Sequence, residues 1–225
     1  MRASRNSKPG LVYLVRHGHS TANQKNILAG RDNSVALSSQ GKKDALELAE
    51  FLRPIEFAAA YSSPLRRCLE TMQPVMIGRQ AQLVERAELL EMEYGEWSGS
   101  KISTLARKPL WKTIQSNPSQ VRFPGGESFM EMNSRIVDAV QDLAIGGKNV
   151  LICTHGDVIK SLITSFMGSH IDNLQKVSID PASISIVSVG GTNRVLKVNQ
   201  TTHLNRSDTQ STKPTLGGGS GGSRI

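Results

Sequence analysis

The chain has 225 residues, 38% of them hydrophobic and 20% charged, which is ordinary for a globular protein with one sizeable core. Its formal net charge is +8, but residues 1–10 contribute +3 and residues 205–225 contribute +2, so residues 11–204 carry only +3. No basic run interleaved with aromatic residues occurs, and no apolar run approaches the roughly 20 residues that span a bilayer. We therefore expect neither a nucleic-acid partner nor a membrane partner.

Two cysteines bear on the cellular compartment. Cys68 falls in an expected helix and Cys153 in an expected buried strand, so a disulfide framework is not expected. The basic N-terminal segment contains no apolar stretch typical of a secretory signal. Together these features predict a cytoplasmic protein.

The N-terminal part of the chain is organised by its first strand. Residues 1–10 are expected to form a disordered basic arm, and the strand at 11–16 is an apolar, mostly β-preferring run typical of burial on both faces. Residues 20–36 lack helical periodicity and are expected to form a long loop above the sheet. A helix follows at 38–53, and its expected apolar face consists of Leu46, Leu48, Ala49 and Leu52.

The middle of the chain alternates short strands and helices. A strand at 57–61 leads to Ser62-Ser63-Pro64, where we expect a serine oxygen to cap a helix that continues to about residue 78. Another strand is expected at 82–84. Residues 98–125 are expected to form short helices that cover the site as a cap.

The last part of the chain continues this alternation. A long helix is expected to open at Gly125-Gly126-Glu127-Ser128 and to end at Gly146-Gly147. It is followed by a strand at 149–153, a helix over 156–167 and strands near 183–189 and 194–199. From residue 205 the composition turns to Ser, Thr and Gly, which predicts a flexible tail. The pattern predicts a single α/β domain over 11–204, with a mainly parallel central sheet flanked by helices on both faces.

Two of the expected strands end in the same way. Arg16-His17-Gly18 follows the first strand, and His155-Gly156 follows the strand at 149–153. The carboxyl ends of parallel strands border the ligand crevice of open α/β sheets, so a guanidinium and two imidazoles are expected at one site. This combination suggests phosphoryl transfer through a histidine.

These motifs resemble the histidine phosphatase superfamily, which includes the phosphoglycerate mutases. Ser20, Thr21 and Asn23 follow the first motif as in that family, and the ordered set spans about residues 11 to 160. The other blocks of the set are Leu37-Ser38-x-x-Gly41, Ser62-Ser63-Pro64-Leu65-Arg66-Arg67, Leu90-Glu91-x-x-Tyr94-Gly95-Glu96-Trp97, Pro124-Gly125-Gly126-Glu127 and Thr154-His155-Gly156. The resemblance implies a phosphoglycerate mutase-like fold and a small phosphorylated substrate.

The resemblance also implies roles for individual residues of these blocks. His17 would be the nucleophile, attacking phosphorus through a neutral imidazole whose other nitrogen is held by a backbone acceptor near Gly18. Arg16, Arg67 and His155 would hold the phosphoryl oxygens, because guanidinium forks suit that geometry.

A second group of residues completes the implied site. Glu91 would be the general acid that protonates the leaving oxygen and then the base that activates water, with Glu93 and Glu96 as competing carboxylates. Asn23 would bind the substrate phosphate. Glu127 would also bind substrate, although a negative charge near a helix N-terminus explains that residue equally well.

Several alternatives remain open at this point. A phosphomutase of the phosphoglycerate mutase type shares the nucleophile, but the apolar Trp97, Trp111 and Phe123 around 98–124 favour hydrolysis. His19 replaces a frequent glutamate of the family, and His17-x-His19 resembles the paired ligands of metal-dependent hydrolases. A non-catalytic binding module would have lost some of these residues. We expect a phosphatase without metal or other cofactor, and an exposed sheet edge would permit a homodimer.

Overall fold

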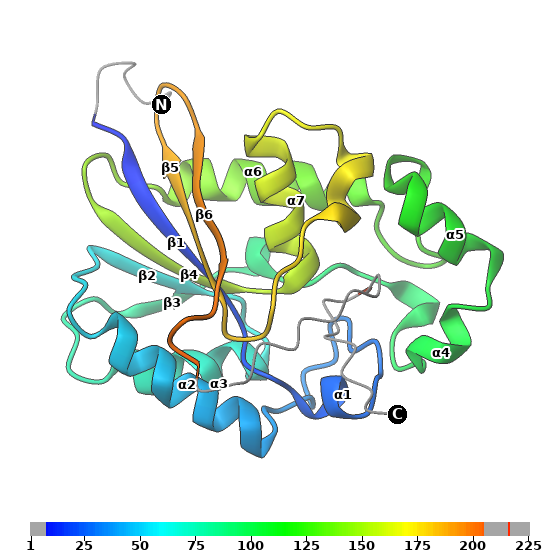
Figure 1. Cartoon of the computed structure of the whole chain (residues 1–225), viewed down its shortest axis with the longest axis horizontal. Coiled ribbons are helices and arrows are strands. Elements are labelled where there is room, and N and C mark those ends of the chain that lie inside the picture. The colour runs from blue at the N-terminus through cyan, green and yellow to red at the C-terminus, as the bar shows by residue number, and fades with distance from the viewer. Residues whose placement is uncertain (1–7, 205–215, 217–225) are drawn as a thin grey trace.

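The computed structural model describes residues 8–204 and Leu216. Within them six strands form one sheet: β1 (Gly10–Arg16), β2 (Ala59–Ser62), β3 (Leu83–Glu85), β4 (Asn149–Thr154), β5 (Ile184–Val189) and β6 (Arg194–Gln200). Their order is β3-β2-β4-β1-β5-β6 (Figure 1). Strands β1 to β4 are parallel to one another, whereas β5 is antiparallel to both β1 and β6. The mainly parallel sheet is therefore confirmed.

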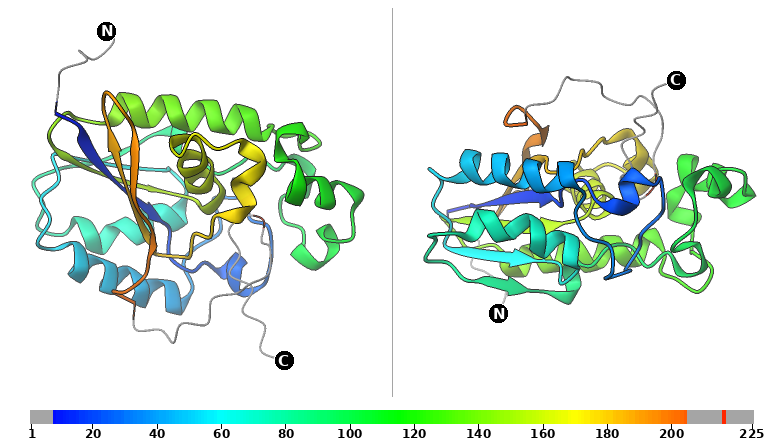
Figure 2. Two further views of the ribbon diagram at one scale, coloured as in Figure 1. Left: turned by 45° about the horizontal axis from the view of Figure 1, so that its top comes forward. Right: turned by 90° about the horizontal axis from the view of Figure 1, so that it is seen from below.

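Helices cover both faces of this sheet, as predicted. Helices α2 (Ser39–Leu52) and α3 (Arg66–Met76) lie on one face, and α6 (Phe129–Leu143) and α7 (Gly156–Phe166) lie on the other (Figure 2, left). The shorter helices are α1 (Thr21–Gln24), α4 (Ile102–Leu105) and α5 (Pro109–Ser116), with 3₁₀ turns η1 (Ala87–Leu89), η2 (Gly95–Trp97), η3 (Pro118–Gln120) and η4 (Ile171–Lys176). Helices α4 and α5 extend beyond the sheet, at the right of Figure 1.

Alternate residues of the central strand β1 pack against different helix layers. Val12 and Leu14 belong to the hydrophobic cluster that includes α6 and α7. Tyr13 and Val15 pack in the cluster that includes α2 and α3. Successive side chains of a strand point to opposite faces, so a strand covered on both sides needs a continuous apolar run. Because β1 is packed on both faces, the position of its carboxyl end, where Arg16 lies, is fixed relative to both helix layers.

Helix α2 begins as predicted but buries a different stripe. The Ser38 side chain accepts a hydrogen bond from a backbone N–H of the first turn. Ala45, Leu48 and Leu52 are buried, whereas Leu46 is 60% exposed. The inclusion of Leu46 in the apolar face was wrong, because that residue lies about 100° around the helix from Ala45.

The start of α3 also differs from the prediction. The helix begins at Arg66, and its N-cap residue Leu65 makes no side-chain capping bond. The Ser63 hydroxyl instead lies 2.9 Å from Nε2 of His155. The Ser63 oxygen also accepts from the Leu65 N–H at 3.4 Å, but it reaches no N–H within α3, so the predicted cap was wrong for the helix itself. Helix signals do not reveal a long-range partner such as His155.

The loop and the chain ends add three details. Residues 20–36 contain one helical turn, α1, which the sequence pattern did not predict and which a capping box of Ser20 and Asn23 opens. Gly10, expected in the arm, is the first residue of β1. The rest of the expected arm and tail, residues 1–7, 205–215 and 217–225, lies outside the described residues. Leu216, within the expected flexible tail, has a buried side chain in the hydrophobic cluster that includes α6 and α7.

Candidate active site

The two strand-end histidines meet because β1 and β4 are parallel neighbours in register. Arg16 lies opposite Thr154, and the His17 N–H donates to the Thr154 carbonyl at 3.0 Å. The ring centroids of His17 and His155 are 5.2 Å apart. Both imidazoles are buried. The sheet thus joins, at its carboxyl edge, residues that are separated by about two thirds of the chain.

His17 is held as a neutral imidazole with one defined tautomer. Its Nδ1 lies 2.8 Å from the Gly18 carbonyl, which can only accept, so Nδ1 carries the proton. Burial, followed by the positive charges of Arg67 and Arg16, holds the pKa of His17 well below its usual value. Nε2 is therefore the basic nitrogen at neutral pH. The Gly18 N–H in turn donates to the Thr71 hydroxyl at 2.9 Å.

Two buried arginines flank the histidines. Arg67 donates to the Gly30 carbonyl at 2.7 Å, and its Nη2 lies 3.2 Å from Nδ1 of His155. Arg16 donates through Nη1 to the Ile179 carbonyl at 2.6 Å, while its Nε and Nη2 have no hydrogen-bond partner among the described residues. Burial lowers the pKa of Arg16 to about 10, so the guanidinium stays charged at neutral pH. Unsatisfied buried donors of this kind suit an anion.

The hydrogen bonds of His155 fix its protonation as well. A guanidinium only donates, so Nδ1 of His155 accepts from Arg67 and Nε2 carries the proton toward the Ser63 hydroxyl. Burial, followed by the charge of Arg67, lowers the pKa of His155. His155 is thus neutral and holds the Arg67 fork in place.

Glu91 is the buried carboxylate of the acidic segment. One of its oxygens accepts from the Met92 N–H at 3.0 Å, and the other lies 3.9 Å from Nδ1 of His155. Burial, followed by the negative charge of Asp157, raises the pKa of Glu91 to about 7. The competing Glu93 pairs with a surface arginine, and Glu96 is exposed. With its pKa near 7, Glu91 is poised to exchange a proton near neutral pH.

A buried polar cluster behind Glu91 was not predicted. The Tyr94 hydroxyl donates to Asp157 Oδ2 at 2.7 Å, and Lys160 Nζ lies 3.3 Å from Asp157 Oδ1. All three side chains are buried. The available signal was an Asp and a Lys three residues apart on α7, a helix whose other positions are largely apolar. That this cluster lies near Glu91 can be recognised only once the chain is folded.

A small pocket opens on these groups. It is lined by His17, Ser20, Asn23, Ile27, Ala29, Gly30, Arg67, Glu91 and Tyr94. Arg16 and His155 are also buried but do not belong to this lining. The side-chain Oδ1 of Asn23 accepts from the backbone N–H and the hydroxyl of Ser20, so this residue both caps the start of α1 and borders the pocket.

Two residues singled out in the sequence lie outside the pocket lining. Glu127 accepts hydrogen bonds from Arg31 and Arg135 and from one backbone N–H. Arg66, the alternative to Arg67, has an exposed side chain paired with Glu70 at 2.7 Å. The structure thus separates the two neighbouring arginines of the motif, one buried at the site and one on the surface.

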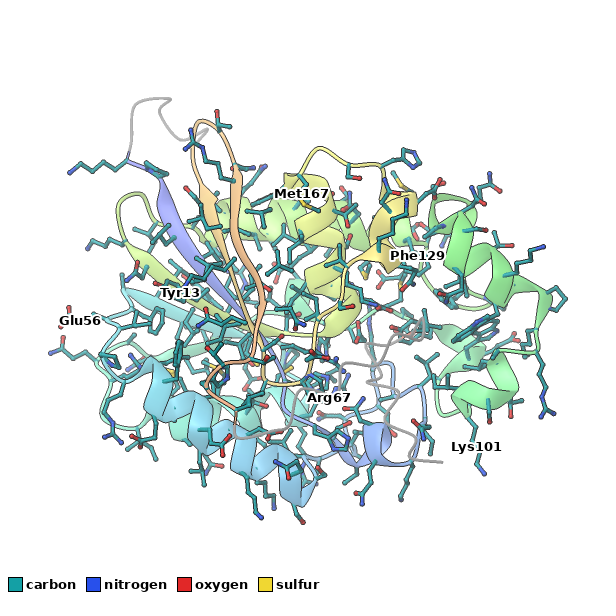
Figure 3. All side chains as sticks on the ribbon, viewed as in Figure 1. Tyr13, Glu56, Arg67, Lys101, Phe129 and Met167 are labelled. Carbon is teal, nitrogen blue, oxygen red and sulfur yellow. The ribbon has the colours of Figure 1, made fainter. Side chains whose placement is uncertain are left out.

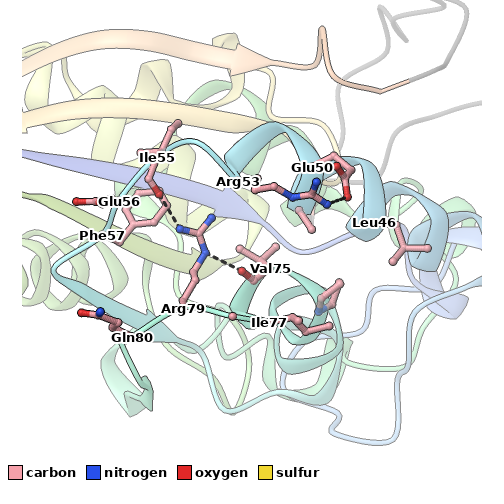
Figure 4. A pocket seen from close by; sticks show the side chains of 13 residues that line it. Leu46, Glu50, Arg53, Ile55, Glu56, Phe57, Val75, Ile77, Arg79 and Gln80 are labelled. Carbon is pink, nitrogen blue, oxygen red and sulfur yellow. Dashed lines mark hydrogen bonds and ion pairs between the residues drawn. The ribbon is translucent and has the colours of Figure 1, made fainter.

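A larger pocket, of about 570 Å³, lies elsewhere, where α2 and α3 end and the chain enters β2 (Figure 4). Its most buried cation, Arg79, donates to the carbonyls of Leu52, Ile55 and Val75 at 2.6–2.7 Å. Figure 3 places Arg67 near the centre of the molecule and Glu56, from the larger pocket, at its left edge. No residue of this second pocket belongs to the motifs.

His19 does not join His17 as a paired ligand. Its Nδ1 lies 2.9 Å from the Ser38 hydroxyl. Within residues 8–204 and at Leu216, no group of three His, Cys, Asp or Glu side chains is arranged to hold a metal ion.

Cys68 and Cys153 are both buried and free. In the described part of the chain, residues 8–204 and Leu216, no helix has the length and apolarity to cross a membrane.

Comparison with known proteins decides the family. The profile of the histidine phosphatase superfamily (branch 1) matches residues 12–201. This chain belongs to that superfamily. The resemblance inferred from the motifs is confirmed, and the mixed six-stranded sheet is the fold of its structural relatives.

Individual relatives of this histidine phosphatase carry different activities in their names. A protein of Hydrogenobacter thermophilus provisionally named phosphoserine phosphatase 2 is 32% identical over 80% of this chain and 90% of its own length. A 2,3-bisphosphoglycerate-dependent phosphoglycerate mutase of Parvibaculum lavamentivorans is 31% identical over 69% of this chain and 79% of its own. The solved structure of Bacillus stearothermophilus YhfR superposes with a TM-score of 0.80 at 30% identity, covering 86% of this chain and 98% of its own.

Proposed function

We propose that this protein is a phosphatase that hydrolyses small phosphomonoesters through a phosphohistidine intermediate on His17. One observation carries the proposal: the Gly18 carbonyl holds the Nδ1 proton of a neutral His17, so Nε2 is the nucleophilic nitrogen in a pocket that Arg67 and Glu91 also line. The pocket supplies the charge and the proton that the reaction needs.

The first half of the proposed reaction phosphorylates the enzyme. Nε2 of His17 attacks phosphorus, and the bond between phosphorus and the ester oxygen breaks. Glu91, protonated below its pKa of about 7, gives its proton to the leaving oxygen. Arg67 and the unpartnered N–H groups of Arg16 stabilise the charge on the equatorial oxygens.

The second half returns the enzyme to its starting state. The Glu91 carboxylate takes a proton from water, and the resulting hydroxide attacks phosphorus. The bond between phosphorus and Nε2 of His17 breaks, and orthophosphate leaves. Splitting one difficult displacement into two easier ones is the gain of covalent catalysis.

Hydrolysis is favoured over transfer to a second acceptor by the rest of the lining. Beyond the reacting groups His17, Arg67 and Glu91, the pocket is lined by Ser20, Asn23, Ile27, Ala29, Gly30 and Tyr94, none of which carries a positive charge. The lining therefore offers no second cation to hold an anionic acceptor. The phosphoglycerate mutase relative supports phosphomutase activity as the second candidate.

Phosphate release from a panel of phosphomonoesters in excess chelator separates the two candidates. The panel includes phosphoserine and 3-phosphoglycerate, and the wild type is compared with His17→Ala. The matched control is His170→Ala, which removes an exposed imidazole distant from the site. Phosphate release that disappears only in His17→Ala is the expected result. Conversion of 3-phosphoglycerate to its 2-isomer without phosphate release would identify a mutase, and activity retained in His17→Ala would contradict both.

A further inference from the structure

Three charged residues from separate segments meet against the loop that carries Glu91. They are Arg31, Glu127 and Arg135, which we name the acid-loop clamp, and the acid loop is residues 88–93. A single oxygen of Glu127 accepts from Nη2 of Arg31 at 3.1 Å and from Nη2 of Arg135 at 2.8 Å. The carboxylate thus joins the two arginines through one shared oxygen.

Each clamp arginine also reaches the backbone of the acid loop. Arg31 donates through Nε to the carbonyl of Glu91 itself at 2.9 Å. Arg135 donates through Nη1 to the carbonyls of Glu88 at 2.6 Å and Leu90 at 2.9 Å. A planar guanidinium with several fixed N–H directions can hold a carboxylate and a carbonyl at once, which an ammonium cannot do with the same geometry.

The segment before α6 completes the grip on the loop. The Glu127 side chain accepts from the Glu93 N–H at 2.9 Å, and the Glu127 N–H donates to the Glu93 carbonyl at 3.0 Å. The preceding Gly126 permits this approach, because a Cβ there would lie 2.1 Å from the Glu93 carbonyl oxygen. Three segments are therefore fastened to the backbone on either side of Glu91.

The clamp is partly shielded from water and lies outside the pocket. The side chain of Glu127 is 15% exposed, that of Arg135 is 19% exposed and that of Arg31 is 30% exposed. None of the three belongs to the pocket lining. Partly buried, charge-assisted hydrogen bonds that converge on one loop suit the placement of its side chain better than contact with a ligand.

We propose that the acid-loop clamp positions Glu91 for proton transfer, and that Glu127 acts on the loop and not on the substrate. This inference rests on the proposed function, in which Glu91 protonates the leaving oxygen. General acid catalysis depends on hydrogen-bond reach, so a loop shift of about 1 Å is enough to weaken it. Glu127 thereby receives a role different from the substrate contact that the family resemblance implied.

The test is the dependence of kcat/KM on the leaving group, because kcat/KM reports the phosphorylation step. An alkyl phosphate needs the proton from Glu91, whereas p-nitrophenyl phosphate has a leaving group that departs without it. Glu127→Ala is expected to lower kcat/KM by about 30-fold for the alkyl ester and by less than about 3-fold for the aryl ester. Glu50→Ala is the matched control, since Glu50 forms an exposed pair with Arg53.

A double-mutant cycle distinguishes positioning from general damage. If Glu127 acts through Glu91, adding Glu127→Ala to Glu91→Gln changes kcat/KM by less than about 2-fold. Equal losses for both leaving groups, or losses that add in the cycle, would overturn the clamp. Should Glu127→Ala fail to fold, Arg31→Lys in the same cycle makes the same prediction, because it removes the Nε bond to the Glu91 carbonyl.

The failure of the clamp and that of the proposed function give different results. If Glu91→Gln alone shows no dependence on the leaving group, Glu91 is not the general acid and the proposed function fails at that point. If Glu91→Gln shows the dependence and Glu127→Ala does not, the proposed function stands and the clamp is wrong.

Discussion

The two ends of the parallel sheet each carry a pocket and an arginine, but the two arginines are in opposite states. At the carboxyl end, Arg16 is fully buried and keeps two N–H groups without a partner in the described residues. At the amino end of β2, three backbone carbonyls accept from Arg79, and its guanidinium lies 5.0 Å from the centre of the Phe57 ring. Arg79, which lines the larger pocket, is thus satisfied, whereas Arg16, which lies at the same end of the sheet as the smaller pocket but outside its lining, is not.

In this molecule, therefore, the volume of a pocket is a poor guide to its chemistry. Burial and neighbouring charges push the pKa of Glu91 up to about 7 and the pKa of His17 down. In the larger pocket, burial lowers the pKa of Arg79. Groups that line one pocket and have pKa values shifted in opposite directions are typical of the acid, base and nucleophile of an active site.

The largest loss of activity among these variants is expected from Arg67→Ala. Arg67→Ala removes a charge from the pocket and leaves Nδ1 of His155 without its donor. We expect kcat/KM to fall by about 10²–10³-fold. Steady-state phosphate release measures the loss, with Arg66→Ala as the control because Arg66 pairs with Glu70 on the surface. Equal losses for the two arginines would contradict the assignment.

Removing the titrating carboxyl has the next largest effect. Glu91→Gln is expected to lower kcat/KM for an alkyl phosphate by about 10²-fold. In the wild type the rate falls as the pH rises through about 7, because Glu91 then loses the proton it must donate. That decline is absent in the variant. A pH profile of kcat/KM for both proteins shows this, and an unchanged profile in the variant would remove Glu91 from the mechanism.

A smaller effect is expected from the buried cluster behind Glu91. Asp157→Asn removes the negative charge that helps to raise the pKa of Glu91, so that pKa falls. The alkaline decline of kcat/KM therefore moves to lower pH, and activity at pH 7–8 falls a few-fold. The substitution also removes the ion-pair partner of the buried Lys160, so thermal unfolding is recorded to separate a loss of stability from the change in pKa. A shift of the decline to higher pH would show that the electrostatic account is wrong.

The smallest effect on activity is expected at the other end of the sheet. Arg79→Ala removes three hydrogen bonds to carbonyls, so the free energy of unfolding is expected to fall by about 1–3 kcal/mol. Because Arg79 lies far from the reacting groups, kcat/KM is expected to change by less than about 2-fold. Urea unfolding and the phosphate assay give the two values. A large loss of activity in folded Arg79→Ala would overturn the comparison.

The sequence predicted best what parallel strands determine directly. His17 and His155 follow neighbouring strands, and strands of the same direction bring their ends to one edge whatever the intervening chain does. The serine at position 63 shows the opposite case. Its local pattern predicted a helix cap, yet its hydroxyl lies beside His155, which is 92 residues away. Local propensity carries no information on such a partner.

The acid side of the site could be predicted only in part. Glu91 stands in a recognisable block, but its burial and its neighbour Asp157 depend on how the loop packs against α7. The clamp needs residues from three segments to meet, and Glu127 taken alone fits a helix N-terminus equally well. Sequence periodicity predicts elements, whereas the position of an irregular loop is decided by long-range hydrogen bonds.

Trapping the phosphoenzyme tests directly whether His17 becomes phosphorylated. Wild-type protein is mixed with ³²P-labelled phosphomonoester in excess chelator and quenched in alkali within milliseconds, since phosphohistidine survives alkali and is lost in acid. The account predicts one equivalent or less of acid-labile label on His17, which is absent from His17→Ala and present in His170→Ala. Steady hydrolysis with no label on the protein at any time, or label that persists in His17→Ala, would contradict it.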